Sequence, residues 1–595
     1  MVFLLSPQRW LLSLFLFIPL GLSSQSFELV QEFSHQSQLT NSTGVAVADY
    51  DLDGDLDLYL VASEVFDPNN EQTWSRLLRN EGGEGFTDVT QDARLINWQA
   101  QTRDGTNGAK MGASWGDYDN DGYPDIFLSN YGLDELWHNE GDGTFRNVSQ
   151  EMGVEGCFYC YSSNAVWWDY DLDGDLDLTV SDWIKPNRMY RNDGAEGFTD
   201  ISEKTRLNDK RHTFSCLPID QNGDGWLDLY IINDNSDNRF LRNKGNDVFV
   251  EITGQIGLTN NGNGMGVDVC DVNNDGLFDI YVTNIFSYLP NPFFVKKDDG
   301  RFTDQAESLR VHDTGWGWGA RFFDVDHDGD EDLYVVNGFD SPVAEGDQNR
   351  FFLNASSTFE DISEELGVDD PEKGMGLEVF DMDMDGDLDM VLGNRDAHAV
   401  LYRHAFKGAG SNANWIQIQL EGTRSNKNAF GATLAIHFGE RVLHRYHSGV
   451  NLFGQSIKAV HVGLAEHHLV DRIQVDWPGG LKEVFGPFAA NQFVDLVEGN
   501  GTRVIPETPD ATSTVFPTPF QDQLWLRLGE DIEGDISLRL TDIGGKTILK
   551  ETYPGPFGKD LITPLMIDPL LSPGFYLYHI LGEGIEKKGK LLKQQ

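Results

Sequence analysis

The chain alternates short apolar segments with acidic loops over most of its length. Segments such as "GVAVA", which starts at Gly44, and "DLYLV", which starts at Asp57, are rich in β-branched and aromatic residues. Short apolar runs of this composition, bounded by turn residues, are typical of buried strands rather than helices. We therefore predict an all-β chain in which each acidic loop joins two strands.

The acidic loops repeat in a fixed register. The nonapeptide "DYDLDGDLD" occurs twice without change, and the relaxed pattern D-x-[DN]-x-D-G-x-x-D occurs seven times. The copies, called loops 1 to 7 below, start at Asp49, Asp117, Asp169, Asp220, Asp271, Asp324 and Asp381. Their start-to-start spacings are 68, 52, 51, 51, 53 and 57 residues. A period of about 50 residues indicates a repeat architecture.

The composition of the loops predicts calcium binding. Oxygen ligands at positions 1, 3, 5 and 9, a backbone carbonyl at position 7 and a glycine at position 6 suit a hard cation. An EF-hand would require Glu at position 12, where all seven loops have an apolar residue, so this alternative is excluded. We expect about seven calcium ions, one per loop. The candidate ligands are Asp49, Asp51, Asp53, Asp55, Asp57, Asp117, Asp119, Asp121, Tyr123, Asp125, Asp169, Asp171, Asp173, Asp175, Asp177, Asp220, Asn222, Asp224, Trp226, Asp228, Asp271, Asn273, Asp275, Leu277, Asp279, Asp324, Asp326, Asp328, Asp330, Asp332, Asp381, Asp383, Asp385, Asp387 and Asp389.

A single loop of this kind could be an ordinary acidic hairpin turn, since Asp, Asn and Gly all favour turns. The constant ligand register favours calcium instead. Loops 4 and 5 are the weaker candidates, because Asn222 and Asn273 remove a charge at position 3.

A second landmark is an F-x-x-[VI] segment near the end of each unit, for example Phe86 to Val89. The unit that begins at Asp381 lacks one, whereas "SFELVQ", containing Phe27 and Val30, precedes the first loop without a unit of its own. The N-terminal strand is thus expected to complete the last unit and close a ring, which removes the exposed sheet edges. We predict a seven-bladed β-propeller; an open β-solenoid would not need a displaced strand.

Units of this length with D-x-D-x-D-G-x-x-D between strands resemble the FG-GAP or VCBS repeats of integrin α-chain propellers over roughly residues 27 to 410. The resemblance implies that the metals are structural and that ligands bind elsewhere on the propeller. After residue 412 the chain resembles the ASPIC/UnbV domain that follows such propellers in the cartilage acidic protein family. The positions that match its signature are Gly431, Gly449, Gln455, Ser456, Gly463, Leu464, Trp477, Pro478 and Gly480.

Two small β domains should follow the propeller. The end of the chain resembles the C-terminal sorting domain of the type IX secretion system of Bacteroidota, although Thr518 replaces the usual Asn between two prolines. A carbohydrate-binding or immunoglobulin-like module is the alternative for this segment. We divide the chain into a signal peptide (1–24), the propeller (25–411), the ASPIC/UnbV domain (412–499), a linker (500–514) and the sorting domain (515–595).

The N-terminus predicts export, because Arg9 precedes an apolar run that ends in small residues. No segment is long and apolar enough for a predicted transmembrane helix. We expect a protein that is secreted or held on the outer surface of a Bacteroidota-type bacterium, and that meets the outer-membrane secretion machinery through its C-terminal domain. Cys157 and Cys160 are a disulfide candidate, with a redox motif as the weaker alternative, whereas Cys216 and Cys270 are expected to be buried thiols.

The net charge of −52 disfavours nucleic acid as a partner. We expect a non-enzymatic binding or adhesion module for an extracellular protein or glycan. The alternative is an extracellular polysaccharide-active enzyme with its site in the propeller channel, although common hydrolase motifs are absent.

Two groups of residues could favour a more specific activity. Five tryptophans could stack on sugars, although core packing is the preferred interpretation: Trp115, Trp167, Trp168, Trp316 and Trp318. Six histidines could form a metal or catalytic cluster, although ordinary strand and loop positions explain them: His437, His444, His447, His461, His467 and His468.

Overall fold

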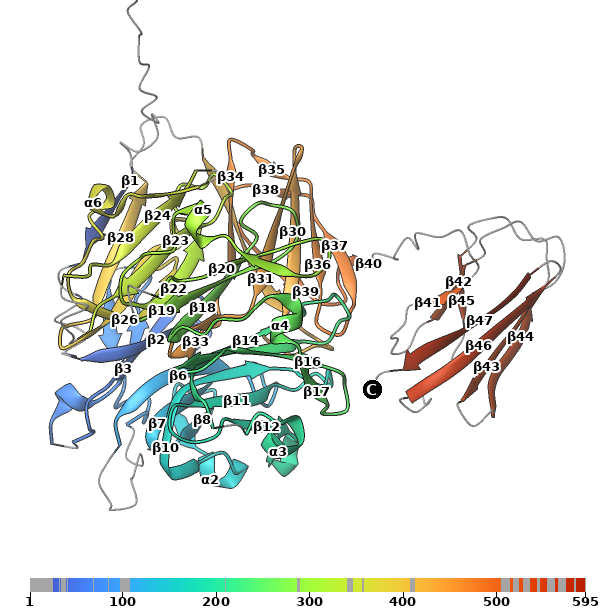
Figure 1. Ribbon diagram of the computed structural model, residues 1–595, viewed down its shortest axis with the longest axis horizontal. Helices are drawn as coiled ribbons and strands as arrows, with labels where there is room; N and C mark the ends of the chain where they lie inside the picture. Colours follow the sequence, from blue (N-terminus) through green and yellow to red (C-terminus); the bar gives the residue numbers. More distant parts are fainter. Residues whose placement is uncertain are drawn as a thin grey trace, which may run out of the picture.

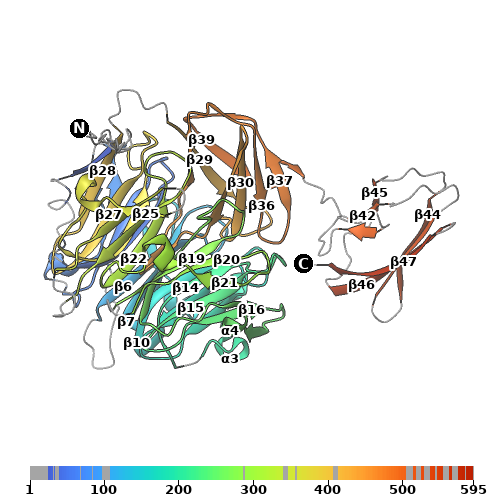
Figure 2. The same cartoon turned by 45° about the horizontal axis from the view of Figure 1, so that its top comes forward.

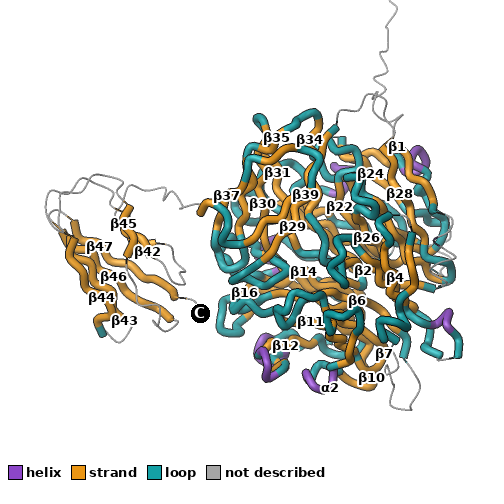
Figure 3. Tube along the Cα trace, turned by 180° about the vertical axis from the view of Figure 1, so that it is seen from behind, coloured by secondary structure: helices purple, strands orange, loops and turns teal. Residues whose placement is uncertain are grey.

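The computed structural model describes residues 25–593 except 31–32, 34–38, 40, 68, 84, 97–107, 209, 286–288, 340–345, 356–357, 407–412, 504–513, 517–523, 528–535, 543–545, 554–561, 566–573 and 583–584. The predicted signal peptide lies outside these residues, as does most of the predicted linker. Strands dominate the structure, and Figure 3 shows helices only as short turns between them. The prediction of an all-β fold is confirmed. In the described segments, no helix has both the length and the apolarity needed to cross a bilayer.

The strands of the first domain pair as antiparallel four-stranded meanders, each built around one acidic loop and called units 1 to 7 here (Figure 1). Unit 1 contains β2 (Ser42–Ala48), β3 (Asp57–Ala62), β4 (Arg76–Asn80) and β5 (Phe86–Asp88). Unit 2 contains β6 (Lys110–Gly116), β7 (Asp125–Leu133), β8 (Glu135–Asn139) and β9 (Phe145–Asn147). Unit 3 contains β10 (Gly156–Trp168), β11 (Asp177–Asp182), β12 (Arg188–Asn192) and β13 (Phe198–Asp200). Unit 4 contains β14 (His212–Ile219), β15 (Asp228–Asp234), β16 (Arg239–Asn243) and β17 (Phe249–Glu251).

The remaining units follow the same order. Unit 5 contains β18 (Gly264–Cys270), β19 (Asp279–Asn284), β20 (Phe293–Lys296) and β21 (Phe302–Asp304). Unit 6 contains β22 (Gly317–Phe323), β23 (Asp332–Asn337), β24 (Arg350–Asn354) and β25 (Phe359–Asp361). Unit 7 contains β26 (Lys373–Phe380), β27 (Asp389–Arg395), β28 (Val400–Phe406) and the N-terminal strand β1 (Gln25–Leu29). Residue Phe27 of β1 pairs with His404 of β28, as the displaced N-terminal segment predicts.

The units close a ring. The first strand of each unit packs against the first strand of the next, and β26 packs back on β2. An asparagine on the third strand links neighbouring units: the Asn139 amide donates to the Tyr50 carbonyl of unit 1 at 2.8 Å. Asn80 makes the closing bond in the same way, to the Met382 carbonyl of unit 7 at 2.8 Å. The first strands are buried along most of their length, so they line the central channel.

Short helical turns follow the fourth strand in five units: α2 (Ser149–Met152), α3 (Ser202–Thr205), α4 (Thr253–Ile256), α5 (Ala306–Leu309) and α6 (Ser363–Leu366). Two 3-10 turns, η2 (Glu71–Thr73) and η3 (Gly194–Glu196), lie in loops between strands. The Val or Ile of the F-x-x-[VI] segment comes just after the strand and is buried, as for Val148 and Ile362. It closes the core between strand and turn.

A second domain continues the chain beside the ring (Figures 1 and 2). Its strands are β29 (Asn414–Glu421), β30 (Ala432–Phe438), β31 (Arg441–His447), β32 (Val450–Asn451), β33 (Gly454–Gln455), β34 (Val460–Ala465), β35 (Leu469–Val470), β36 (Arg472–Asp476), β37 (Lys482–Phe485), β38 (Phe488–Ala489), β39 (Phe493–Val497) and β40 (Thr502–Arg503). A five-stranded sheet, β31-β30-β36-β37-β40, and a three-stranded sheet, β34-β29-β39, enclose its apolar core. The strands β32 and β33 leave this domain and pair with each other, and β33 also pairs with β6 of the ring.

The C-terminal strands form two further sheets. They are β41 (Thr514–Phe516), β42 (Leu524–Arg527), β43 (Ile536–Asp542), β44 (Thr547–Tyr553), β45 (Ile562–Leu565), β46 (Gly574–Gly582) and β47 (Ile585–Lys593). Their pairing gives the orders β41-β42-β45 and β44-β43-β46-β47. The C-terminal segment is thus a small β module, as predicted.

Candidate functional site

All seven acidic loops adopt one backbone conformation. In loop 1 the Asp49 carboxylate accepts the backbone N–H groups of Asp53 at 3.1 Å and Gly54 at 3.0 Å. The equivalent pair of bonds forms in loops 2 to 7. Positions 4 and 6 have positive φ, with 59° at Leu52 and 101° at Gly54. The glycine is therefore required by a backbone conformation that other residues rarely adopt.

The carboxylate at position 9 ties each loop to the sheet. Asp57 is fully buried, and it accepts the N–H of Tyr50 at 3.2 Å and that of Asn80 at 2.8 Å. Corresponding bonds form at position 9 of every other loop. Each oxygen keeps a further lone pair, so this residue can still contribute to a metal site.

The donor sets fit a hard cation. Carboxylate oxygens of Asp49, Asp51 and Asp53 lie within 4.8 Å of one another, and loop 2 contains the equivalent cluster; in loops 3 and 6 the clustered carboxylates are those at positions 1, 3 and 9. In the described part of the chain, the Oδ1 atoms of Asp51 and Asp171 are buried and accept no hydrogen bond. A cation at the centre of the loop would satisfy these atoms and balance the repulsion between the carboxylates.

The electrostatics of the bare loops agree with this fit. Burial, with a smaller effect of Asp51 and Asp49, raises the pKa of Asp57 to about 8. Burial and the charge of Asp328 raise the pKa of Asp324 to about 8. A bound cation would stabilise the ionised form of these carboxyl groups and so offset the effect of burial on their pKa.

Loops 4 and 5 differ from the others. The side-chain amides of Asn222 and Asn273 donate to the position 5 carboxylates of their own loops, at 2.8 Å and 2.9 Å. Lys296 lies between the two loops: burial lowers its pKa, while the charges of Asp220, Asp279 and other loop carboxylates oppose that shift. A protein cation thus supplies part of the positive charge near the carboxylates of these two loops.

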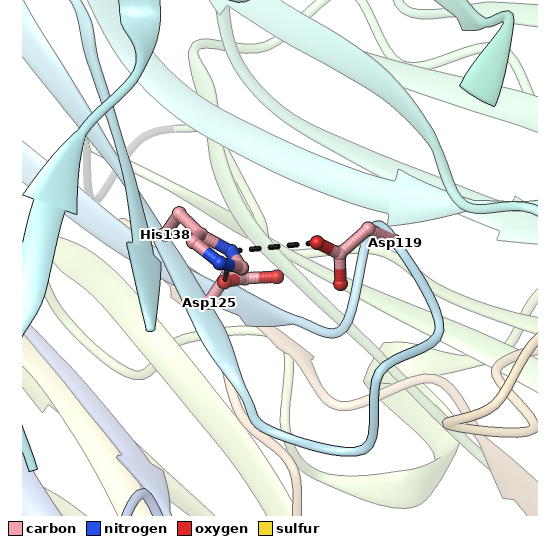
Figure 4. Close-up of side chains that lie close together, drawn as sticks. All are labelled: Asp119, Asp125 and His138. Atoms are coloured by element: carbon pink, nitrogen blue, oxygen red, sulfur yellow. Dashed lines mark hydrogen bonds and ion pairs between the residues drawn. The ribbon is translucent and has the colours of Figure 1, made fainter. Parts of the chain in front are cut away.

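Loop 2 is contacted by an imidazole of β8 that the sequence reasoning missed (Figure 4). His138 Nδ1 lies 3.1 Å from Asp125 Oδ1 and 3.4 Å from Asp119 Oδ2. The hydrogen bond to Asp125 is the main cause that raises the pKa of His138 to about 8. The same register carries arginine in units 1, 3, 4 and 7, and Arg403 lies 3.6 Å from Asp383. In the sequence, the recurring "RN", "HN" and "RH" dipeptides on the third strand could have indicated that a basic side chain lies beside the acidic loop.

The second domain covers part of the rim formed by the acidic loops. His444 Nδ1 lies 3.1 Å from Asp271 Oδ2, the Gly463 N–H donates to Asp324 at 3.1 Å, and Gln417 donates to Asp381. Each of these three aspartates occupies position 1 of its loop. The domain therefore contacts the loops directly.

From this rim the second domain inserts a hairpin into the channel. The hairpin, residues 447–458, is called the plug here. The Ala113 N–H of β6 donates to the Phe453 carbonyl at 3.0 Å, and the Asn451 amide donates to the Val45 carbonyl at 3.1 Å. The plug backbone approaches so closely that a Cβ atom at Gly112 would lie 2.6 Å from the Phe453 carbonyl oxygen. Glycine on the first strand therefore makes room for the plug.

A buried ionic cluster holds the plug in place. Glu378 on β26 is fully buried and accepts two hydrogen bonds from Arg321 Nη2, at 2.8 Å and 2.9 Å. Its carboxylate also accepts hydrogen bonds of 2.6 Å from Lys458, Ser456 and Asn451 of the plug. Burial alone would raise the pKa of Glu378. The charges of Arg321 and Lys458 outweigh this effect and lower the pKa to about 2.

The channel remains open at its other mouth. A pocket of about 410 Å³ receives side chains from all seven units, and Phe453 of the plug is also part of its wall. Its aromatic lining comes from Tyr161, Trp183, Phe214, Trp316, Trp318, Phe339 and Phe453. Trp316 stacks on Phe339 with ring centroids 5.2 Å apart.

Comparison with known families matches two parts of the chain. The model of the FG-GAP-like repeat matches residues 117–180, 169–231 and 220–282, and the model of the ASPIC and UnbV domain matches residues 422–503. The chain carries FG-GAP-like repeats and an ASPIC/UnbV domain. The plug, His444 and Gly463 lie within the matched ASPIC/UnbV residues, whereas Gln417 precedes them.

Several curated proteins are distant relatives. Cartilage acidic protein 1 of Mus musculus is 27% identical over 172 residues, which cover 27% of this chain and 26% of that protein. Its Xenopus tropicalis counterpart is 27% identical over 266 residues, which cover 42% of this chain and 40% of that protein. The chain therefore matches well under half the length of these relatives.

Solved structures give weaker likenesses. An Agrocybe aegerita lectin, described as recognising non-reducing terminal N-acetylglucosamine, has a TM-score of 0.33 and 16% identity, covering 54% of this chain and 79% of its own. The Dos1 propeller has a TM-score of 0.34 and 8% identity, covering 62% of this chain and 93% of its own. Likenesses this weak say nothing about the function of the chain.

Three of the five tryptophans considered for sugar stacking are core residues, whereas Trp316 and Trp318 line the open mouth of the channel. Trp115, Trp167 and Trp168 are fully buried in the propeller core. The histidines of the ASPIC/UnbV domain have separate partners: His447 contacts the Asn428 carbonyl, and His461 packs on His327. They do not share one centre in the described residues.

The cysteines pair as the sequence suggests. Cys157 and Cys160 form a disulfide with a Cα–Cα distance of 5.2 Å, and Cys216 and Cys270 are buried thiols.

Proposed function

We propose that this chain is a calcium-stabilised, non-enzymatic binding module that acts outside the cell. The proposal rests on the content of the central channel, because the alternative function, a polysaccharide-active enzyme, would have its active site there. The plug fills it from the loop rim, and the pocket at the other mouth has one carboxylate, Asp234, among its described lining residues. Glycoside hydrolysis ordinarily needs a pair of carboxylates across the scissile bond.

Calcium has a structural role in this proposal. The carboxylates at positions 1, 3, 5 and 9, with the carbonyl at position 7, would hold the ions, most strongly in loops 1, 2, 3, 6 and 7. A bound ion supplies positive charge that lets these carboxylates stay ionised while buried. The rim would then form a rigid base for the ASPIC/UnbV domain.

The proposed location rests on the predicted signal peptide and on the C-terminal β module. A signal peptide would direct export across the inner membrane, and the C-terminal β module would engage the type IX secretion machinery of a Bacteroidota-type bacterium. Deletion of residues 515–595 should then keep the protein in the periplasm of such a host, while the full chain reaches the surface or the medium. Equal export of both forms would contradict this assignment.

The test of function compares binding with turnover. Purified protein is screened against protein, glycan and polysaccharide panels, and both retention and product formation are scored. We expect saturable retention of a protein or glycan without product. Product formation from a polysaccharide would support the enzyme and overturn the proposal.

A further inference from the structure

The open mouth of the channel combines aromatic walls with a few polar residues, of which Asp234 and Arg395 are the charged ones among those described. Trp183 packs on Tyr161 at 5.7 Å between ring centroids, and Trp318 lies 5.9 Å from both Phe214 and Phe339. Pockets of 300 to 1,000 Å³ with mainly apolar walls and a few placed polar groups are typical small-ligand sites. The volume of about 410 Å³ falls within this range.

The mouth is separated from the calcium rim. Thr43 at the start of β2 lines the pocket, whereas loop 1 begins at Asp49 after the end of the same strand. A strand rises about 3.3 Å per residue, so the two sites lie about 20 Å apart. Phe453 lies between them, with its ring 6.1 Å from Phe214 and 6.2 Å from Trp318. The pocket therefore has a floor and opens on the face opposite the loops.

The polar groups of the mouth select the ligand by charge. Asp234 is buried and accepts a hydrogen bond of 3.1 Å from Trp183 Nε1, which fixes the indole in the wall. Arg395 lies over the Phe339 ring at 4.7 Å and its side chain is 37% exposed. One acidic and one basic group disfavour both a cation and an anion as ligand. Hydroxyl groups suit both, because they donate to a carboxylate and accept from a guanidinium.

We propose that this mouth, called the aromatic pocket here, binds a neutral saccharide of one or two pyranose rings. The C–H face of a pyranose stacks on indole and phenyl faces, while its hydroxyls reach Asp234 and Arg395. The lone carboxylate would orient the sugar and leave the glycosidic bond intact. This inference rests on the proposed function, since it names the ligand class and the place of binding for the same non-enzymatic module.

The test measures tryptophan fluorescence of the full chain, with calcium present, during titration with neutral disaccharides: maltose, cellobiose, lactose and chitobiose. A glycan array extends the set of neutral sugars. We expect saturable quenching by at least one sugar, because three tryptophans line the pocket. Arg395→Gln and Trp183→Leu should each weaken binding about tenfold or more.

Arg350→Gln is the matched control, since Arg350 also forms an ion pair on the propeller but is not part of the pocket. It should bind like the wild type, and thermal melts verify that all variants fold. Sugar binding that Arg395→Gln and Trp183→Leu leave unchanged would overturn the pocket assignment and leave the proposed function standing. The saccharide class would be overturned if no sugar changed the protein's fluorescence. It would also be overturned if the sugars quenched free N-acetyltryptophanamide to the same extent as the protein. Sugar turnover would instead overturn the proposed function.

Discussion

Replacement of Glu378 by glutamine should uncouple the ASPIC/UnbV domain from the propeller. The carboxylate lies in the interior of the propeller and binds Arg321 of β22 and Lys458 of the plug. Glutamine has nearly the same shape, so the variant removes charge without opening a cavity. It leaves the buried Arg321 and the partly buried Lys458 without their common counter-ion, and Asp268, 3.6 Å from Arg321, is the carboxylate that remains.

The expected cost follows from the burial of the cluster. Removal of one partner from a buried ion pair costs about 3 to 5 kcal/mol, whereas exposed pairs contribute about 0 to 1 kcal/mol. The Arg321 and Glu378 side chains are 7% and 0% exposed, so the buried case applies. We expect Glu378→Gln to lower the free energy of unfolding by about 3 to 5 kcal/mol.

Guanidinium denaturation at pH 7 with excess calcium, followed by tryptophan fluorescence, measures this loss. The control is Glu81→Gln, whose partner Arg79 lies 2.8 Å away in an exposed pair. We also expect the propeller and the ASPIC/UnbV domain to unfold in more widely separated transitions than in the wild type, because the plug no longer couples them. If Glu378→Gln unfolds with the same free energy as Glu81→Gln, the cluster does not anchor the plug and the reasoning is wrong.

Three further predictions concern pH, calcium and thiols. The difference in free energy of unfolding between wild type and Glu378→Gln should be full above pH 4.5 and disappear as the pH falls toward 2. The reason is that the folded-state pKa of Glu378 is lowered to about 2, so acid protonates the carboxylate and removes its stabilising charge. A difference that stays constant down to pH 2 would contradict this prediction. Chelation should lower the melting temperature, because an ion at 100 times its Kd stabilises the folded state by about 2.7 kcal/mol per site; an unchanged melt with far fewer than seven ions per chain by elemental analysis would refute the calcium sites. Iodoacetamide should label no cysteine of the native protein, and two, Cys216 and Cys270, after unfolding without reductant; labelling of four would exclude the disulfide in solution.

The repeat and its closure could be predicted because the information is local in the sequence. Each loop carries its own ligand register and its own glycine, and each is flanked by two short apolar strands. The pairing of β1 with β28 followed from an unpaired segment at one end and a missing one at the other. These deductions required only the count and order of segments.

The plug could not be predicted, because its contacts join residues that no local pattern connects. Glu378 and Lys458 are 80 residues apart, and the Trp167 N–H binds Gln455 across 288 residues. Gln455 and Ser456 were recognised only as positions of a family signature. The structure gives them a physical role, since the Ser456 hydroxyl accepts the Val47 N–H and donates to Glu378.

The plug also determines how the rim formed by the acidic loops and the aromatic pocket can influence each other. It contacts the rim at one end through the ASPIC/UnbV domain, and it presents Phe453 to the pocket at the other. We therefore expect that removal of calcium from the loops would change the pocket mainly through movement of this hairpin, because the inner strands that join the two faces are buried in the ring. Glu378→Gln should thus weaken sugar binding even with calcium present, whereas the exposed Glu81→Gln should not. A Glu378→Gln variant whose plug is loosened in denaturation but whose sugar affinity is unchanged would show that the pocket does not depend on its floor.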